Sequence, residues 1–155
     1  MSEVDKVTFT SAKFGEMTID QTSVLTFPNG LPGFERLTRY GLLTIEEEAP
    51  FLRLLCIDDP TVGFVLLNPM LIWEDYNPQI NAEDLGALEI EGPDEMAMYC
   101  IVTLSPVPQE VTANLKGPIA VNTRTMTARQ MILTDDTYHT KHSLLAASEQ
   151  VAQSP

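Results

Sequence analysis

The chain has 155 residues, 44% of them hydrophobic, which is enough to bury the core of one domain. Its 22 acidic residues against 9 Lys and Arg give a formal net charge of −13, which argues against direct binding of nucleic acid phosphates. No apolar run approaches the roughly 20 residues of a membrane span, and the N-terminus does not resemble a secretory signal, so we expect a cytoplasmic protein with no membrane partner.

Short apolar runs rich in β-branched residues predict a mainly β protein. In chain order, the predicted strands cover residues 7–14, 17–27, 39–45, 51–57, 63–69, 96–105, 119–126 and 128–133. Proline cannot donate to a strand ladder, so we expect connections at Pro28, Pro32, Pro50, Pro60, Pro69, Pro106, Pro108 and Pro118. The pattern favours a single-domain antiparallel β-barrel-like fold, with a sandwich as the alternative.

Helix is predicted in one or two short segments only. Residues 81–90 can form one, because Asn81 can cap it and Glu83 and Asp84 suit its first turn. Residues 142–153 contain good helix formers with one apolar face, and this tail is either helical or frayed. We therefore place the β domain at 1–145 and a C-terminal tail at 146–155.

Two adjacent acids, Asp58 and Asp59, precede a buried run and are the first candidates for a site. Adjacent residues on a strand point to opposite faces, so the two carboxylates would converge only in a turn. The step from Asp59 to Pro60 is typical of a tight turn. No histidine or other acid–base partner can be named for them, so a turn or surface role is favoured over catalysis.

Other enzyme and metal sites have little support in the sequence. His139 and His142 are three residues apart, which on a helix would put them on one face, but no third ligand is adjacent. Cys56 and Cys100 have apolar neighbours, which favours buried, reduced thiols over a disulfide or a nucleophile. No glycine-rich phosphate loop and no serine nucleophile motif is present. We expect no enzyme activity, no metal and no cofactor.

The acidic residues are concentrated in one stretch. Between Arg53 and Lys116 the sequence has no basic residue, and it contains the acids Asp58, Asp59, Glu74, Asp75, Glu83, Asp84, Glu89, Glu91, Asp94, Glu95 and Glu110. A surface of this kind attracts basic proteins. The alternative is that the charge only keeps the protein soluble.

Four blocks of sequence resemble one known family in their order and spacing. They are "LTFPNGLPGFE" (25–35), "LLCIDDPTVGFVLLNP" (54–69), "VTANLKGPIAVN" (111–122) and "RQMIL" (129–133). Together they resemble FliW, the bacterial flagellar assembly factor, over about residues 7 to 145. Each block alone is a weak signal, and the combination is specific.

The resemblance implies a small, barrel-like, non-catalytic protein with two alternative protein partners. One is flagellin, and the other is CsrA, an RNA-binding protein that represses flagellin translation. Binding of CsrA is expected to relieve repression, and newly made flagellin is expected to take the protein away from CsrA. An acidic surface suits a basic RNA-binding partner, because negative potential near an RNA site weakens RNA binding.

Composition and position select the candidate site residues within this frame. Acids and interleaved aromatic residues are typical of a binding surface, although a half-buried loop also explains Trp73 and Tyr76. The candidates for partner binding are Asp58, Asp59, Trp73, Glu74, Asp75, Tyr76, Asn114 and Lys116. The candidates for a structural role in a turn or in the core are Pro32, Gly33, Phe34 and Asn68. Phe34 is expected to close one end of the barrel from the core.

Two other functions remain open at this point. One is a chaperone dedicated to flagellin, without a role in translation. The other is a small hydrolase or sugar-binding barrel that uses Asp58 and Asp59, or a metal on His139 and His142. Both have the same predicted fold, so binding partners and bound metal distinguish the three.

Overall fold

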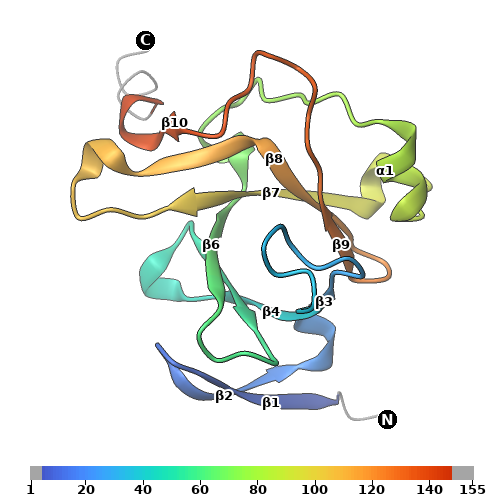
Figure 1. Ribbon diagram of the computed structural model, residues 1–155, viewed down its shortest axis with the longest axis vertical. Coiled ribbons are helices and arrows are strands. Elements are labelled where there is room, and N and C mark those ends of the chain that lie inside the picture. Colours follow the sequence, from blue (N-terminus) through green and yellow to red (C-terminus); the bar gives the residue numbers. More distant parts are fainter. Residues whose placement is uncertain (1–4, 148–155) are drawn as a thin grey trace.

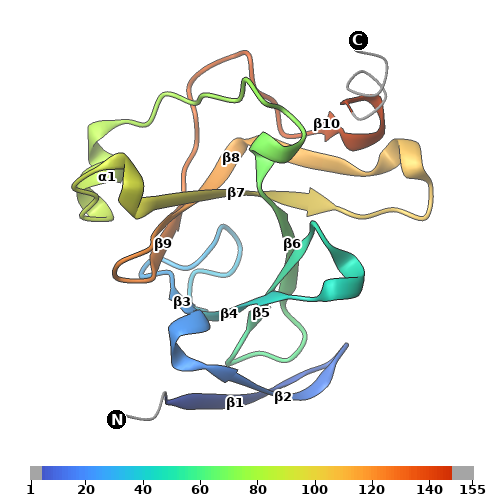
Figure 2. The same ribbon diagram turned by 180° about the vertical axis from the view of Figure 1, so that it is seen from behind.

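Residues 5–147 are described by the computed structural model, and seven of its strands form a closed β-barrel (Figures 1 and 2). These strands are β3 (Val24–Thr26), β4 (Arg39–Thr44), β5 (Leu52–Cys56), β6 (Gly63–Leu67), β7 (Met96–Thr103), β8 (Thr112–Asn122) and β9 (Thr127–Gln130). Consecutive strands pair antiparallel, and a parallel contact between Thr26 and Thr127 closes the barrel. The predicted mainly β, barrel-like fold is confirmed.

Further elements extend the barrel at its ends. β1 (Lys6–Ser11) and β2 (Gly15–Asp20) form a separate hairpin at the bottom of Figure 1, and β10 (His142–Ser143) pairs with the start of β8. The hairpin packs on the barrel through Phe9 and Ile19, which contact Val24 and Leu55. Besides the helical residues 144–147, the helical elements are α1 (Ala82–Ala87) and the 3-10 turns η1 (Gln21–Ser23), η2 (Glu46–Glu48), η3 (Pro69–Leu71), η4 (Pro93–Glu95) and η5 (Pro108–Glu110).

Large apolar side chains fill the inside of the barrel. Leu25, Phe27, Tyr40, Leu54 and Leu66 are all fully buried there. The rings of Phe27 and Tyr40 meet edge to face with centroids 5.2 Å apart, a favoured aromatic geometry. Burial raises the pKa of Tyr40 to about 12, so its hydroxyl stays neutral in this apolar interior. The barrel interior is therefore a packed core, and binding groups have to be sought on the outer surface.

The segment predicted as one strand over 17–27 is two strands in the structure. β2 ends at Asp20, the turn η1 follows, and β3 starts at Val24. The chain leaves the hairpin sheet and enters the barrel sheet at this point. Residues 20–23 (DQTS) are all polar and interrupt the alternation, so the sequence carries a signal of this change of sheet that the prediction of one strand passed over.

Strand β8 contains Pro118, which we predicted to mark a connection. The pairing of β7 with β8 shifts its register, because Tyr99 faces Ile119 whereas Ile101 faces Asn114. The residues between 114 and 119 form a bulge, where the missing N–H of a proline breaks no ladder bond between these two strands. The prediction of a connection at Pro118 is wrong for this reason.

The predicted helix is present but shorter than 81–90. α1 spans Ala82–Ala87, and the side chain of Asn81 accepts a hydrogen bond of 2.8 Å from the backbone N–H of Asp84, as expected of its cap. In the second candidate segment, 142–153, residues 142–143 form β10 and 144–147 are helical, and the rest lies outside the described residues. None of the helices within residues 5–147 is long and apolar enough to cross a membrane.

The connection from β3 to β4, residues 27–38, lies over the opening that the barrel strands surround in Figure 1. Two of its glycines, Gly30 and Gly33, have positive φ values of 63° and 86°. A Cβ atom on Gly30 would lie 2.4 Å from the backbone oxygen of Phe34, whereas the space around Gly33 is open. Only Gly30 is therefore required both for its conformation and for a close backbone approach.

Replacing Gly30 by Ala is expected to lower the free energy of unfolding by about 2 kcal/mol, since it adds a backbone clash to the cost of a left-handed residue. Gly33→Ala has the conformational cost alone and serves as the matched control, with an expected loss of about 1 kcal/mol. Urea unfolding of the two variants measures the difference. Equal losses would show that the close approach at Gly30 contributes nothing.

Candidate functional site

Asp58 and Asp59 lie in the turn between β5 and β6, and each is engaged locally. The Asp58 carboxylate accepts hydrogen bonds of 3.3 and 2.8 Å from the guanidinium of Arg39. The Asp59 carboxylate accepts hydrogen bonds from the hydroxyl and the backbone N–H of Thr61, and these lower its pKa. These contacts are typical of a turn that holds its own backbone. Neither contact gives its carboxylate a proton-transfer partner.

In the loop that follows η3, the two acids are exposed to solvent and the two aromatic side chains are partly or fully buried. Glu74 and Asp75 are exposed, and Trp73 is half-buried with its ring centroid 6.0 Å from that of His142. Tyr76 is only 3% exposed, and its hydroxyl donates a 2.8 Å hydrogen bond to the backbone oxygen of Leu115. The expected partner contact does not fit a side chain buried in this way, and Tyr76 instead anchors the loop to the barrel.

Asn114 and Lys116 lie in the bulge of β8. The side-chain oxygen of Asn114 accepts hydrogen bonds from the backbone N–H groups of Lys116 and Gly117, at 3.0 and 2.8 Å. The ammonium group of Lys116 lies 3.8 Å from the carboxylate of Asp136. Asn114 therefore stabilises the bulge itself, and Lys116 has a nearby acid on the segment after β9.

The residues with an expected structural role lie in two turns. Pro32 and Gly33 occupy a tight turn in which the Phe34 N–H donates to the oxygen of Leu31, and Asn68 accepts a hydrogen bond from the N–H of Met70. Phe34 keeps 36% of its surface exposed and contacts Phe64 edge to face at 5.7 Å. The expectation of a core position for Phe34 is wrong, because the loop that carries it lies over the opening of the barrel and buries Leu31 there, while Phe34 stays partly exposed.

The acidic stretch does not form one continuous face. The turn with Asp58 and Asp59 contacts the β1–β2 hairpin, where the Ala12 N–H donates to the Pro60 oxygen. The helix α1 lies at the opposite end of the molecule, beside β7 and β9 (Figure 1). An antiparallel meander sends successive turns to opposite ends, so residues close in sequence become distant. The largest group of acids, which we call the acidic segment, comprises Glu83, Asp84, Glu89, Glu91, Asp94 and Glu95 around α1 and η4.

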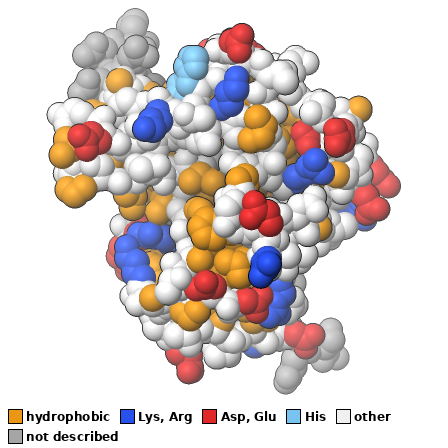
Figure 3. Space-filling view, viewed as in Figure 1, with side chains coloured by type: hydrophobic (Ala, Val, Ile, Leu, Met, Phe, Trp, Pro, Cys, Tyr) orange, Lys and Arg blue, Asp and Glu red, His pale blue; other side chains and the backbone are white. Residues whose placement is uncertain are grey.

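Ion pairs from the β8–β9 hairpin hold the acidic segment. The guanidinium of Arg129 lies 2.9 Å from the carboxylate of Asp84, whose side chain is only 10% exposed. Arg124 pairs with Glu95 at 3.2 Å in the same way. Figure 3 shows acidic side chains gathered at the edge of the molecule over α1, on the right of the view.

A buried side-chain amide also attaches α1 to the β8–β9 hairpin. Asn122 is fully buried, and its side-chain nitrogen donates a 2.8 Å hydrogen bond to the backbone oxygen of Leu88, where α1 ends. Its side-chain oxygen accepts hydrogen bonds from the backbone N–H groups of Arg124 and Thr125. Asn122, Arg124 and Arg129 could not be identified from the sequence, because only the fold brings them to α1.

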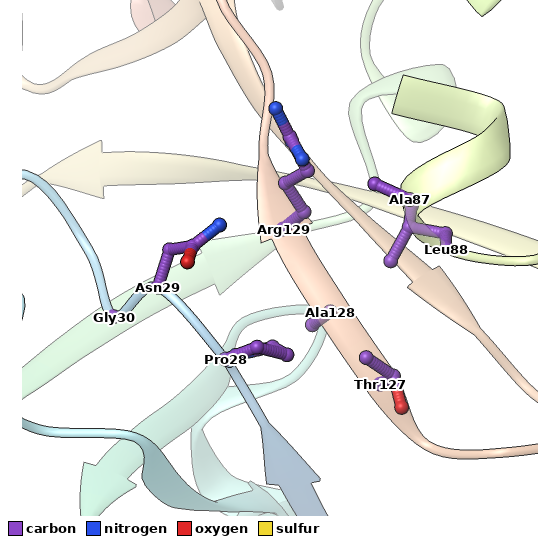
Figure 4. A pocket seen from close by; sticks show the side chains of 8 residues that line it. All are labelled: Pro28, Asn29, Gly30, Ala87, Leu88, Thr127, Ala128 and Arg129. Carbon is purple, nitrogen blue, oxygen red and sulfur yellow. The ribbon is translucent and has the colours of Figure 1, made fainter. Parts of the chain in front are cut away.

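A small pocket beside this attachment is too narrow for an ordinary ligand. It lies between residues 28–30, the end of α1 and β9, with Arg129 rising between Asn29 and Ala87 (Figure 4). Its volume of about 70 Å³ is well below the several hundred cubic ångströms of small-molecule sites.

His139 and His142 contact each other without a third ligand. Their rings stack at 5.4 Å, and the backbone N–H of His139 donates a 2.8 Å hydrogen bond to Nε2 of His142. Among residues 5–147, no three His, Cys, Asp or Glu side chains gather as a metal site would require. The hydrogen bond requires His142 to be unprotonated at Nε2, so this residue is sensitive to pH.

Lowering the pH from 7 to 5.5 is expected to reduce the stability through His142. Burial, and secondly the nearby His139, lowers the pKa of His142 below its ordinary value. The unfolded chain therefore takes up the proton first, near pH 6.5, and stability is lost as the pH falls from there through the folded pKa. Urea unfolding of the wild type and of His142→Phe at the two pH values measures this. An equal loss in both proteins would contradict the role of His142.

The chain is similar to known proteins of one family in both sequence and structure. The model of the FliW protein family matches residues 8–144. The flagellar assembly factor FliW of Thermotoga neapolitana is 38% identical over 135 residues, which cover 86% of this chain and 91% of that protein. The protein of the same name from Thermotoga maritima is 35% identical over 143 residues, covering 92% of this chain and 94% of its own. A crystal structure of the flagellar assembly factor FliW superimposes with a TM-score of 0.82 at 32% identity, covering 89% of this chain and 96% of that chain.

Proposed function

Since the chain belongs to the FliW family of flagellar assembly factors, we propose that it regulates flagellum assembly by binding flagellin and CsrA in alternation. Its family role is regulatory or chaperone-like rather than enzymatic. In this proposal the protein binds CsrA and relieves the repression of flagellin synthesis. Newly made flagellin then removes it from CsrA, which couples flagellin synthesis to flagellin use.

The observation that carries the proposal is the family match over residues 8–144 together with the exposed acidic surface. CsrA has to be basic where it holds RNA, because RNA binding requires neutralised phosphates. An acidic protein therefore associates with it quickly and lowers its affinity for RNA. The acidic segment supports this, because its ion pairs to Arg124 and Arg129 hold it in a fixed position and leave Glu89, Glu91 and Asp94 exposed.

The Trp73–Asp75 loop is the second surface that supports partner binding. Glu74 and Asp75 are exposed beside the half-buried Trp73, a composition that is typical of binding hot spots. Asp58 also lies on the surface, at the other end of the molecule, where it is paired with Arg39. We propose the acidic segment and the Trp73–Asp75 loop as partner-facing surfaces, and Asp58 and Asp59 as the rim of the β5–β6 turn.

Calorimetry of the purified protein with purified flagellin and with CsrA, at low and at high salt, tests the proposal. We expect tight binding to both proteins, with the CsrA complex weakening at higher salt because charge attraction contributes to it. Binding to flagellin alone would reduce the function to that of a flagellin chaperone. Binding to neither would contradict the proposal.

A further inference from the structure

A groove that none of the preceding sites uses lies between η2 and the end of the β7–β8 hairpin. It has a volume of about 340 Å³, and its apolar lining includes Phe51, Val65 and Leu104. In Figures 1 and 2 the end of the β7–β8 hairpin projects from the barrel over the β4–β5 connection, which contains η2. Figure 3 shows apolar side chains gathered around the hollow beneath this projection, on the left of the view. We call it the hairpin groove.

The end of the β7–β8 hairpin, which forms one side of the groove, exposes two large apolar side chains to solvent. Leu104 and Val107 are 50% and 45% exposed, and both lie in the short connection between β7 and β8. The same connection contains Pro106 and Pro108, which restrict the backbone. Such a wall is preorganised, so a bound segment would not have to order it.

The charged residues that line the groove are Glu47, Glu48 and Arg53, with further acids on the neighbouring turns η2 and η5. Glu46 and Glu47 of η2 and Glu110 of η5 are exposed. The one cation in the lining, Arg53, is neutralised by Glu48, to which its guanidinium donates hydrogen bonds of 2.8 and 2.9 Å. Lys13, near the other side of Arg53, lies over the ring of Phe14 at 5.7 Å from its centroid. An apolar groove with an acidic rim is complementary to apolar side chains flanked by Lys or Arg.

We propose that the hairpin groove docks a short apolar segment, flanked by basic residues, of the RNA-binding partner CsrA. The inference rests on the proposed function, and it adds the site of contact. Leu104 of the lining supplies the apolar contact, with the exposed Val107 on the same connection, and Glu47 of the lining supplies the attraction. The acidic segment around α1 lies at the other end of the barrel from this groove (Figure 1), so the two surfaces can be changed independently.

Calorimetry of CsrA and flagellin with three variants tests the inference. The double variant Leu104→Ser with Val107→Ser removes the exposed apolar side chains of the hairpin end. Glu47→Lys reverses one charge at the rim and leaves these apolar side chains unchanged. Ile132→Ser is the matched control, because Ile132 is 65% exposed and lies just after β9. The positions changed in the double variant and in the control are already largely exposed, and unfolding midpoints confirm that each variant folds.

We expect the double variant to bind CsrA about tenfold more weakly, a loss of about 1.4 kcal/mol. Glu47→Lys is expected to weaken CsrA binding at low salt and to make it less sensitive to salt. Ile132→Ser is expected to bind CsrA within about twofold of the wild type, because a single exposed apolar residue outside an interface contributes little.

Three results would overturn the inference. If the wild type binds CsrA and both groove variants bind it equally well, the docking site is wrong and the proposed function stands. If the groove variants lose flagellin and keep CsrA, the groove serves the other partner. If the wild type itself does not bind CsrA, the partner switch and the groove inference fail together.

Discussion

Replacement of Asn122 by Ala is expected to lower the free energy of unfolding by about 3–4 kcal/mol, the cost of breaking one buried and several part-buried hydrogen bonds of a buried amide. Asn122 is fully buried, and its amide joins the backbone oxygen of Leu88 to the backbone N–H groups of Arg124 and Thr125. Ala leaves these groups without their partner, and the oxygen of Leu88 is buried where the bond was made. The change therefore loosens the β8–β9 turn and the end of α1 together.

Urea unfolding measures this loss, with Asn68→Ala as the matched control. The side chain of Asn68 also accepts a hydrogen bond, at 3.0 Å from the N–H of Met70, but the residue is exposed. Water can replace an exposed hydrogen bond, so the control is expected to lose about 1 kcal/mol or less. A loss below about 1.5 kcal/mol for Asn122→Ala would contradict a central role of the buried amide.

Replacement of Arg129 by Met is the second large change, with an expected loss of about 3 kcal/mol, since it leaves a buried carboxylate without its partner. The side chain of Asp84 is 10% exposed and lies 2.9 Å from the guanidinium of Arg129. Met keeps the apolar stem of the side chain and removes only the charge and the hydrogen-bond donors. The loss is therefore attributable to the ion pair rather than to packing.

Arg39→Met is the matched control for the ion pair. Arg39 and Asp58 are 2.8 Å apart, but their side chains are 50% and 44% exposed, and exposed pairs contribute at most about 1 kcal/mol. The double variant Arg129→Met with Asp84→Asn is expected to recover part of the loss, because no charge is then left buried. If the two single changes cost the same, burial of Asp84 is not what makes the pair important.

Much of the fold could be predicted from the sequence because local signals agree with it. The runs at 39–45, 51–57 and 63–69 coincide with β4, β5 and β6 to within two residues at each end. The cap at Asn81 also forms as its side chain predicts. Turn residues, alternation and capping act over a few positions, and a sequence displays them directly.

Features that depend on distant contacts could not be predicted. The barrel closes through a single parallel contact of Thr26 with Thr127, and neither residue signals it. The bulge that accommodates Pro118 depends on the pairing of β8 with β7. Both arise from the way the sheet curves on itself, which local sequence patterns do not record.

The candidate site could likewise be predicted only in part from the sequence. The sequence identifies which residues are acidic, and it suggests that Asp59 begins a turn. It does not show that Tyr76 is buried, that Phe34 lies outside the core, or that Arg129 reaches Asp84. Side chains of one stretch separate or meet according to the strands that carry them, so the acidic segment becomes defined only in the folded barrel.

The partner switch is tested most directly by a competition measurement. A complex of this protein with fluorescently labelled CsrA is titrated with unlabelled flagellin, and the anisotropy reports how much CsrA remains bound. The account predicts that flagellin releases CsrA completely, in proportion to the flagellin added. A stable ternary complex, or no release at saturating flagellin, would contradict it.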